Sequence, residues 1–345
     1  MSKNRKSSSQ YSWFERGGYT SRKAKRYLAN EFDPKKIRKI AVIRHAALGD
    51  QVITRPFLIE ARKFFPNAEI TLVGVSNYQY GMPTDLVDRN VVIHGRDKKN
   101  TVSIQDRLDN FKAVGTQDII FDLAGTNRSY WVTLLNSAKL KIGFPYDVVT
   151  KMIYNAAVFR SDFQPEVEVM LDMLRLLGHV PPARLDFSYP DHMNCVDEQN
   201  PYIVYFNGAS QPSKVLKNEQ ILSLIESAME SFPDYQHVFL EGISEHEKGD
   251  FLEQLATHNN FSVQACLPLD ELIAFCAGAT LMVSPDTGVR NVAIATHTPT
   301  VGVFYSTVPF RYTPRYETIH SIVMNANASV PSNEAIIIAM KQGLN

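Results

Sequence analysis

The stretch Val42–Pro56 reads V-I-R-H-A-A-L-G-D-Q-V-I-T-R-P. The apolar run Ile40–Ile43 predicts a buried strand, and the small residues of Ala46–Gly49 predict a loop behind it. Asp50 follows where a helix should begin, as its N-cap. Open α/β sheets bind ligands at the carboxyl ends of their strands. We therefore expect Asp50 to lie at a ligand site, as a catalytic base.

Length and charge bound the organisation of the chain. Its 345 residues, 44% of them hydrophobic, predict two domains with ordinary cores. The net charge is zero, yet residues 1–40 carry twelve Lys and Arg against three acidic residues, and residues 41–345 balance them with an excess of nine negative charges. This basic leader favours contact with an anionic surface, either phospholipid headgroups or a phosphorylated acceptor. The alternative is a solvated, partly disordered tail.

Targeting signals are missing from the sequence. No segment approaches the roughly 18 apolar residues that span a membrane, and no apolar core follows the N-terminal charges as in a secretory signal. The three cysteines stand far apart in no metal or redox pattern. We expect a cytoplasmic protein that lies on the inner face of the cytoplasmic membrane where its residues 1–40 bind anionic lipid. We expect no nucleic-acid partner.

Strand and helix patterns alternate after the leader, which predicts doubly wound parallel sheets of an α/β protein. The expected strands are Ile37–Arg44, Glu69–Val75, Val91–His94, Asp118–Leu123, Lys141–Phe144, Tyr202–Phe206, His237–Leu240, Ser262–Ala265, Leu281–Ser284 and Thr300–Tyr305. The expected helices are Asp50–Phe65, Val102–Val114, Ser129–Ala138, Pro165–Leu177, Asn218–Ser231, Glu245–His258, Leu269–Ala277, Gly288–Thr296 and Asn333–Gln342. Pro56 predicts a local distortion within the first of these helices.

The proline-rich segment Val180–Pro201 interrupts this alternation and predicts the connection between two similar halves with a cleft between them. The expected division is a leader at 1–36, an N-terminal domain at 37–180, a linker at 181–201, a C-terminal domain at 202–330 and a final helix at 331–345.

Missing motifs exclude several chemistries. The sequence has no G-x-G-x-x-G and no G-x-x-x-x-G-K-[ST], which argues against a nicotinamide dehydrogenase and a P-loop NTPase. No D-x-D offers a carboxylate pair for a metal-bound nucleotide sugar, and no H-x-x-x-H or C-x-x-C suggests zinc. We therefore expect no metal and no cofactor other than a co-substrate.

Two loops in the second half have the features of anion sites. Phe206–Lys214 leads from a strand into small residues and a lysine, so that backbone N–H groups, a hydroxyl and an ammonium can hold a phosphate. Ser284–Asn291 contains an acidic-hydroxyl-glycine turn before a helix, whose first N–H groups favour an anion. The alternative for this turn is an ordinary N-cap, with Asp286 or Thr287 as the capping residue.

In their order, L-G-D at 48–50, G-A-S-x-x-x-K at 208–214 and D-T-G at 286–288 resemble glycosyltransferase family 9, the ADP-heptose:lipopolysaccharide heptosyltransferases. Residues 118–129, D-I-I-F-D-L-A-G-T-N-R-S, are similar to the D-L-x-G-x-x-R-S stretch of that family, and Lys141–Phe144 to its R-x-I-G-F. The resemblance runs from Ile37 to Tyr305. It implies a GT-B fold, two Rossmann-like domains facing a central cleft, and inverting, metal-independent sugar transfer from a nucleotide donor to an anionic glycolipid or glycan such as lipopolysaccharide.

The resemblance also implies roles for single residues. Asp50 falls on the catalytic aspartate of the family. The donor-binding positions it implies are Ser210 and Lys214 at the phosphates, Asp286, Thr287 and Gly288 in the turn that receives the diphosphate, Asn291 three residues beyond that glycine, Glu247 at the ribose and Leu267 near the base. Glu245 is close enough to Glu247 to be confused with it.

Some positions depart from the family pattern. Asn291 stands where histidine is frequent, and it can hydrogen-bond a phosphate without carrying charge. Lys214–Lys217 reads K-V-L-K where K-x-W-P is usual. These changes leave the sugar open between heptose and a related one, and the nucleotide open between ADP and another.

The acceptor side and the activity itself have alternatives. Arg44, His45 and Arg128 are candidates for binding an anionic acceptor, and ordinary surface charge is the alternative for each. Two other functions are a non-catalytic nucleotide-sugar-binding protein and a GT-B-fold epimerase of nucleotide sugars. The presence of Asp50 argues against the first of these.

Overall fold

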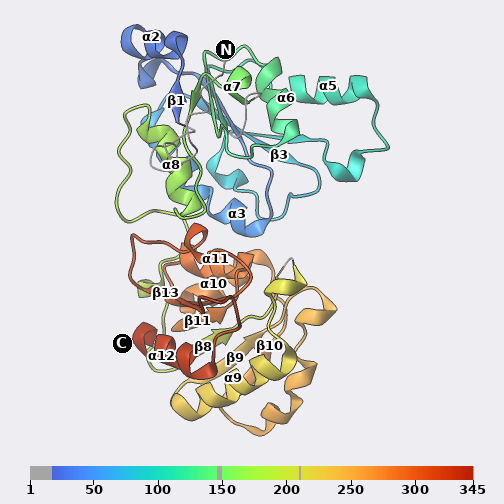
Figure 1. The fold of residues 1–345 in the computed structure, drawn as a ribbon, viewed down its shortest axis with the longest axis vertical. Helices are drawn as coiled ribbons and strands as arrows, with labels where there is room; N and C mark the ends of the chain where they lie inside the picture. The colour runs from blue at the N-terminus through green and yellow to red at the C-terminus, as the bar shows by residue number, and fades with distance from the viewer. Residues whose placement is uncertain (1–17, 146–149, 210, 345) are drawn as a thin grey trace, which may run out of the picture. The chain divides into compact units, whose positions relative to one another are not determined.

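The computed structural model describes residues 18–145, 150–209 and 211–344, which form two compact units (Figure 1). The first unit contains the chain up to Ala47 and Thr54–Pro182. The second contains Leu48–Ile53 and the chain from Ala183 onward. A short piece of the N-terminal half, which includes Asp50, is therefore part of the second unit.

The sheet of the first unit has seven strands in the order β1-β7-β6-β5-β2-β3-β4. Their bounds are β1 Tyr19–Thr20, β2 Lys39–Ile43, β3 Glu69–Val75, β4 Arg89–Ile93, β5 Ile119–Asp122, β6 Leu140–Gly143 and β7 Ala156–Ala157. All neighbours are parallel except β1, which is antiparallel to β7. From β2 the chain adds β3 and β4 on one side and then β5 to β7 on the other, which is the doubly wound order.

The sheet of the second unit repeats this order with six strands, β10-β9-β8-β11-β12-β13, all parallel. Their bounds are β8 Tyr202–Tyr205, β9 Gln236–Leu240, β10 Phe261–Gln264, β11 Leu281–Ser284, β12 Thr300–Phe304 and β13 His320–Met324. The predicted parallel sheets are thus confirmed, and β3 and β11 have the predicted bounds. Strand β13 was not predicted.

Helices cover both faces of each sheet. The α-helices of the described residues are α2 Arg22–Asn30, α3 Leu48–Val52, α4 Arg55–Phe64, α5 Ile104–Lys112, α6 Asn127–Leu135, α7 Thr150–Ile153, α8 Glu166–Arg175, α9 Asn218–Ser231, α10 Leu269–Gly278, α11 Gly288–Ala295 and α12 Asn333–Leu344. In the second unit, Val301 and Val303 pack in one core with α9 and α12. Gly302, which points to the other face, lies against Arg290 of α11. None of the helices in the described ranges has the length and apolar character to cross a membrane.

The expected helix Asp50–Phe65, with its expected distortion at Pro56, is divided into two elements. The structure has two helices, with α3 ending at Val52 and α4 beginning at Arg55. Pro56 explains the break, because it has no N–H to donate to the carbonyl of Val52 four residues earlier. Helix α3 also begins at Leu48, so Asp50 lies in its first turn and is not the N-cap.

The predicted α-helix Glu245–His258 is wrong, because the segment forms another type of helix. This segment forms two stretches of 3-10 helix, Glu245–Glu247 and Asp250–Thr257. Gly249 separates them, and its N–H donates to the side chain of Glu241 at 2.9 Å instead of continuing a helix. A side chain therefore competes here with the regular backbone pattern.

The leader is structured where the structure describes it. Ser21 caps α2 by accepting a hydrogen bond from the N–H of Ala24 at 3.1 Å, and β1 extends the first sheet at its edge. Lys139 of the first unit lies over the ring of Tyr27, 5.0 Å from its centroid. The alternative of a solvated, partly disordered tail does not extend to residues 19–30, which form β1 and α2, and residues 1–17 lie outside the described ranges.

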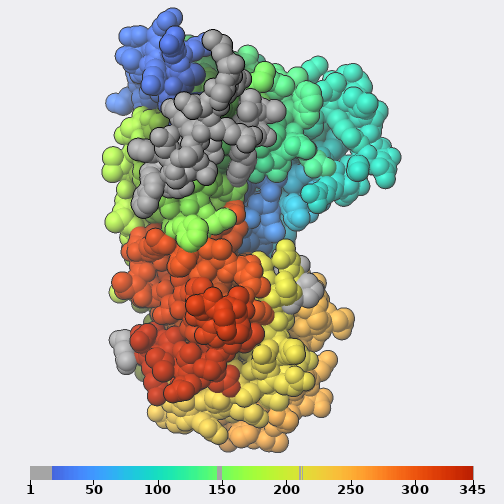
Figure 2. Space-filling view, viewed as in Figure 1, coloured from blue at the N-terminus to red at the C-terminus, as the bar shows by residue number. Residues whose placement is uncertain are grey.

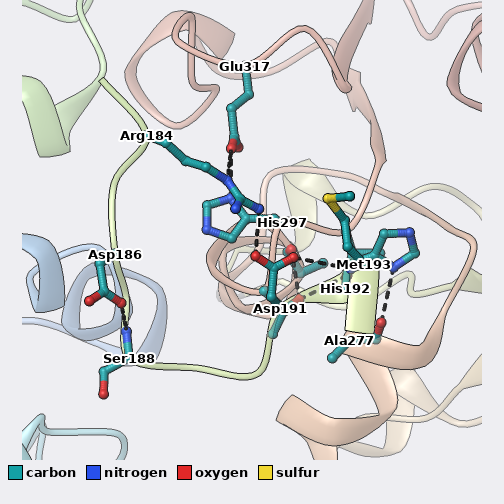
Figure 3. A network of polar contacts seen from close by, with 12 residues as sticks. Arg184, Asp186, Ser188, Asp191, His192, Met193, Ala277, His297 and Glu317 are labelled. Atoms are coloured by element: carbon teal, nitrogen blue, oxygen red, sulfur yellow. Dashed lines mark hydrogen bonds and ion pairs between the residues drawn. The ribbon is translucent and has the colours of Figure 1, made fainter. Parts of the chain in front are cut away.

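A polar network fixes the segment that enters the second unit (Figure 3). Arg184 lies 2.6 Å from Asp191 and 3.6 Å from Glu317. Glu317 accepts hydrogen bonds from His297 at 2.7 Å and from His320 at 3.3 Å. Burial raises the pKa of Glu317, but these histidines outweigh it and lower the pKa to about 2. The segment before β8 is thereby held on the β12–β13 side of its own unit.

This network predicts an acid-dependent contribution to stability. The folded pKa of about 2 lies below the ordinary value of 4.5, so the contribution is present above pH 4.5 and is lost as the pH falls towards 2. Glu317→Gln should lower the free energy of unfolding at pH 7 by about 1.5–3 kcal/mol. Its difference from wild type in urea denaturation should shrink between pH 4.5 and pH 2. Glu334→Gln, on an exposed part of α12, is the matched control, and an equal loss in both variants would contradict the assignment.

Candidate functional site

The strand order points to two places where a ligand could bind. In each sheet the order reverses between two adjacent parallel strands, β2 and β5 in the first unit and β8 and β11 in the second. Ligands bind beyond the carboxyl ends of strands at such a reversal. The loop 206–214 follows β8, and the D-T-G turn 286–288 follows β11. The second unit therefore brings its two predicted anion loops together at the carboxyl ends of the central strands β8 and β11. This end of the sheet is called its ligand edge below.

Helix α3 joins this edge through a close contact between two glycine backbones. A Cβ atom on Gly49 would lie 2.9 Å from the Cα of Gly288 and 2.6 Å from the Nδ2 of Asn291. A Cβ atom on Gly288 would lie 3.0 Å from the backbone nitrogen of Gly49. Side chains do not fit between the two segments, so glycine on both sides permits the contact. Asp50, next to Gly49 and half-buried, is thereby held beside the start of α11.

Lys214 and Asp286 form an ion pair of 2.6 Å between the two loops. Their side chains are 17% and 10% exposed, which makes this pair far less screened than a surface pair. Thr287, and not Asp286, caps α11, because its side chain accepts from the N–H of Val289 at 3.4 Å. The alternative of an ordinary N-cap therefore holds for Thr287. The carboxylate of Asp286 does not cap the helix and pairs with Lys214 instead.

Glu247 lies against two glycines of the same edge. A Cβ atom on Gly208 would fall 2.2 Å from its Oε1, and one on Gly242 would fall 2.3 Å from its Oε2. Its Oε2 accepts a hydrogen bond from the N–H of Ser244 at 2.9 Å. The carboxylate of Glu247 is therefore fixed beside the loop after β8, whereas Glu245 is exposed.

The remaining donor positions are less informative. Leu267 is half-buried in the loop after β10, the edge strand of the sheet. Asn291 is 5% exposed and packs on Gly49 as described. Ser210 lies outside the described residues. Within the described ranges, no three His, Cys, Asp or Glu side chains come together as metal ligands.

Arg44 is held inside the first unit. Its side chain is 2% exposed, and its Nη1 donates to the carbonyl of Leu123 at 2.8 Å and contacts Glu166 at 3.3 Å. Arg160 also pairs with Glu166, through its Nε at 2.9 Å and through a second contact from Nη2. A guanidinium in this position is turned towards a buried carboxylate, which suits a structural role.

His45 and Arg128 lie near the strand reversal of the first unit. The Nδ1 of His45 is 2.9 Å from the hydroxyl of Thr126, the N-cap of α6. Burial, with the charges of Arg128 and Arg44, lowers the pKa of His45 to about 3, so the ring is neutral at physiological pH. Arg128 is half-buried and donates from Nε to the carbonyl of His94 at 2.9 Å.

Asp122, which the sequence pattern did not single out, shapes the same loop. It ends β5, is fully buried, and accepts hydrogen bonds from the N–H groups of Ala124 and Gly125 at 3.0 and 2.9 Å. The hydroxyl of Tyr154 donates to it at 2.6 Å, and burial raises its pKa. The D-L-x-G pattern contained the signal, since a carboxylate followed by a glycine at φ 59° marks such a turn.

Comparisons with known proteins show the family and the fold of the chain. Residues 107–336 match the model of glycosyltransferase family 9 (heptosyltransferase). The chain is 23% identical over 299 residues to lipopolysaccharide heptosyltransferase 1 of Campylobacter coli. This alignment covers 79% of the chain and 85% of the relative.

Two solved structures have the same fold. A family 9 glycosyltransferase of Veillonella parvula has a TM-score of 0.68 at 18% identity and covers 90% of this chain and 98% of its own. The E. coli heptosyltransferase WaaC with ADP-2-deoxy-2-fluoro heptose has a TM-score of 0.69 at 18% identity and covers 88% and 99%. These similarities, together with the doubly wound order of the two sheets of this chain, confirm the predicted α/β fold of the GT-B class with two Rossmann-like domains.

The buried Arg44–Glu166–Arg160 cluster gives a stability prediction. Glu166→Ala should lower the free energy of unfolding by about 3–5 kcal/mol, because it leaves the buried guanidinium of Arg44 without its carboxylate. The control is Glu168→Ala on the same helix, whose partner Arg175 is 37% exposed and whose loss should cost about 0–1 kcal/mol. Urea denaturation of both variants measures their free energies of unfolding. Equal losses would show that the buried cluster stabilises the fold no more than the exposed pair does.

Proposed function

The chain belongs to glycosyltransferase family 9, and it is a glycosyltransferase; we propose that it transfers heptose or a related sugar from a nucleoside-diphosphate donor to lipopolysaccharide or another surface glycan. The observation that carries the proposal is the contact between Gly49 and Gly288. It brings the segment of Asp50 next to the start of α11, which supports the two acting on one donor molecule. The names of the relatives support heptose, ADP and lipopolysaccharide as the first substrates to test.

The proposed reaction inverts the anomeric carbon. Asp50 takes the proton of the acceptor hydroxyl as its oxygen attacks the anomeric carbon from the face opposite the diphosphate. The new glycosidic bond forms as the bond to the diphosphate oxygen breaks, and that electron pair leaves with the nucleoside diphosphate. A positioned general base supplies about 10²–10⁴-fold in rate.

The departing diphosphate is stabilised without a metal in this proposal. Lys214 and the N–H groups at the start of α11 supply the positive charge where negative charge develops. The 2.6 Å pair with Asp286 supports this role, because it keeps the ammonium at the turn and offsets the carboxylate there. Ser210 adds a hydroxyl at the phosphates, and Asn291 adds an amide.

The rest of the donor would lie along the same sheet edge. Glu247, fixed by Ser244 and beside Gly208, is suited to accept hydrogen bonds from ribose hydroxyls. Leu267 would pack near the base. These assignments rest on family resemblance together with the position of each residue in the second unit.

Arg128 is the best supported of the three acceptor candidates. It is half-buried, and its Nε donates to the carbonyl of His94. A carbonyl carries no formal charge, so this contact does not neutralise the guanidinium. His45 would bind as a neutral hydrogen-bonding group, since its pKa of about 3 removes its charge. Arg44 has less support, because Glu166 already pairs with it.

The basic leader would hold the enzyme on the inner face of the cytoplasmic membrane. Arg22, Lys23, Lys25 and Arg26 of α2 are exposed, and Figure 2 shows α2 in blue at the surface of the first unit. Each such cation near an anionic bilayer adds about 1 kcal/mol. This position would bring the enzyme to a glycolipid acceptor.

Asp50→Asn tests the base. The variant should keep the thermal shift that donor produces in wild type, because ligand binding to the folded state is unchanged. Turnover should fall by about 10²–10⁴-fold. A panel of ADP, UDP, GDP and CMP sugars identifies the donor, and Asp270→Asn, exposed on α10, is the control. A near-normal rate for Asp50→Asn would remove the base assignment.

Analysis of the products in the same experiment separates the possible activities. A new glycosidic bond supports transfer. An epimerised donor sugar, or donor that binds and stays intact with every acceptor tried, would contradict the proposal.

Vesicle binding tests the leader. Replacing Arg22, Lys23, Lys25 and Arg26 by Gln should weaken binding to phosphatidylserine vesicles by at least about tenfold, and added salt should weaken wild type in the same way. The matched control replaces the four exposed cations Arg96, Lys98, Lys99 and Lys112 of the same unit by Gln. Equal losses in both variants would show that α2 has no particular role.

A further inference from the structure

Arg290 is a buried cation at the third position of α11. Its side chain is 1% exposed, and its guanidinium carbon lies 5.3 Å from the ring centroid of Phe304. Gly302 makes room for it, since a Cβ atom there would lie 2.9 Å from Cζ and Nε of Arg290. The guanidinium is therefore packed over β12, two positions after the glycine of the D-T-G turn.

The hydrogen bonding of Arg290 is incomplete. Its Nη1 donates to the carbonyl of Tyr312 at 3.1 Å, but its buried Nε and Nη2 have no hydrogen-bond partner among the described residues. Burial lowers the pKa of Arg290 to about 10, while Asp286 opposes this shift, so the side chain is still charged at neutral pH. A buried charge of this kind is costly unless an opposite charge offsets it.

The acidic residues near Arg290 are engaged with other cations. Asp286 lies 2.6 Å from the ammonium of Lys214. Glu317 accepts from His297 and His320 and lies beside Arg184. The start of α11 adds further positive potential. Asp286 thus lies near two cations, Lys214 and the buried Arg290.

We propose that Arg290 is a positioning residue for the donor, and that its buried charge holds the donor diphosphate at the start of α11. The inference rests on the proposed function, since it deepens the donor site. Arg290 would act through its field and not by contact, because the guanidinium is covered. In a site of low dielectric such a charge acts over more than one contact distance. Asn291, the next residue, has no charge to serve in its place.

Binding of inorganic pyrophosphate and ADP to the purified full chain tests this proposal. Arg290→Met keeps the apolar stem against Phe304 and removes the charge. It should weaken both ligands by about 10- to 100-fold at low salt, and leave the weaker binding of uncharged adenosine unchanged. The ligand-free variant should unfold at the same temperature as wild type or above it, since an unpaired buried charge is gone.

Two further variants keep the test decisive. Arg55→Met removes another buried arginine, whose charge is matched by Asp85 at 2.8 and 2.6 Å in the first unit. It should lower the melting temperature and leave pyrophosphate affinity unchanged. Arg290→Lys should retain most of the affinity and Arg290→Gln should lose it, which gives the comparison if the methionine variant does not fold.

The outcomes separate this inference from the proposed function. Wild-type affinity for pyrophosphate and ADP in Arg290→Met or Arg290→Gln would overturn the role of Arg290 and leave the donor site standing. A wild-type chain that binds neither pyrophosphate nor any nucleoside diphosphate would overturn both. Loss of adenosine binding together with a lower melting temperature would show a structural role only, and would also contradict the proposal.

Discussion

The contact between the backbones of Gly49 and Gly288 is the constraint on which the candidate site depends. Helix α3 has five residues, too few to be stable without tertiary packing. It is held on α11 by a contact that leaves no room for a Cβ atom on either glycine. Backbone-to-backbone contact fixes position more closely than flexible side chains do, since it involves no rotamers. The backbone next to Asp50 is thereby held at the start of α11 within one compact unit.

The charges of the second unit follow from this arrangement. A carboxylate near a helix start is favourable, and Asp286 has that position before α11. It would repel an incoming anion if it stood alone, but Lys214 lies 2.6 Å away and offsets it. The fixed carboxylate of Glu247 stands on the other loop, against Gly208. The ion pair offsets the carboxylate at the turn 286–288, so that in our proposal the N–H groups at the start of α11 are left to receive the diphosphate. The carboxylate of Glu247 would then accept hydrogen bonds beside it.

Much of this could be predicted from the sequence, and the exceptions have physical causes. Strands β3 and β11 and helix α9 have the predicted bounds because their apolar spacing is unambiguous. The membership of Leu48–Ile53 in the second unit is a tertiary property that no local pattern contains. Arg44 looked like a residue of a binding loop because its partner Glu166 lies 122 positions away. The family resemblance placed Lys214 and Asp286 at one diphosphate, but no local pattern predicts that these residues, 72 positions apart, form an ion pair.

The two units share one strand order but differ in how their polar groups at the strand reversal are satisfied. In the first unit most of these groups have partners within the chain, since Arg44 pairs with Glu166, Asp122 accepts from Tyr154 and two backbone N–H groups, and His45 is neutral. In the second unit a buried guanidinium keeps two nitrogens without a hydrogen-bond partner in the described ranges. Unmatched charge is costly in an interior and is retained where a ligand offsets it. The same topology therefore leaves different polar groups available in the two units, which in our proposal suits the second unit to an anion.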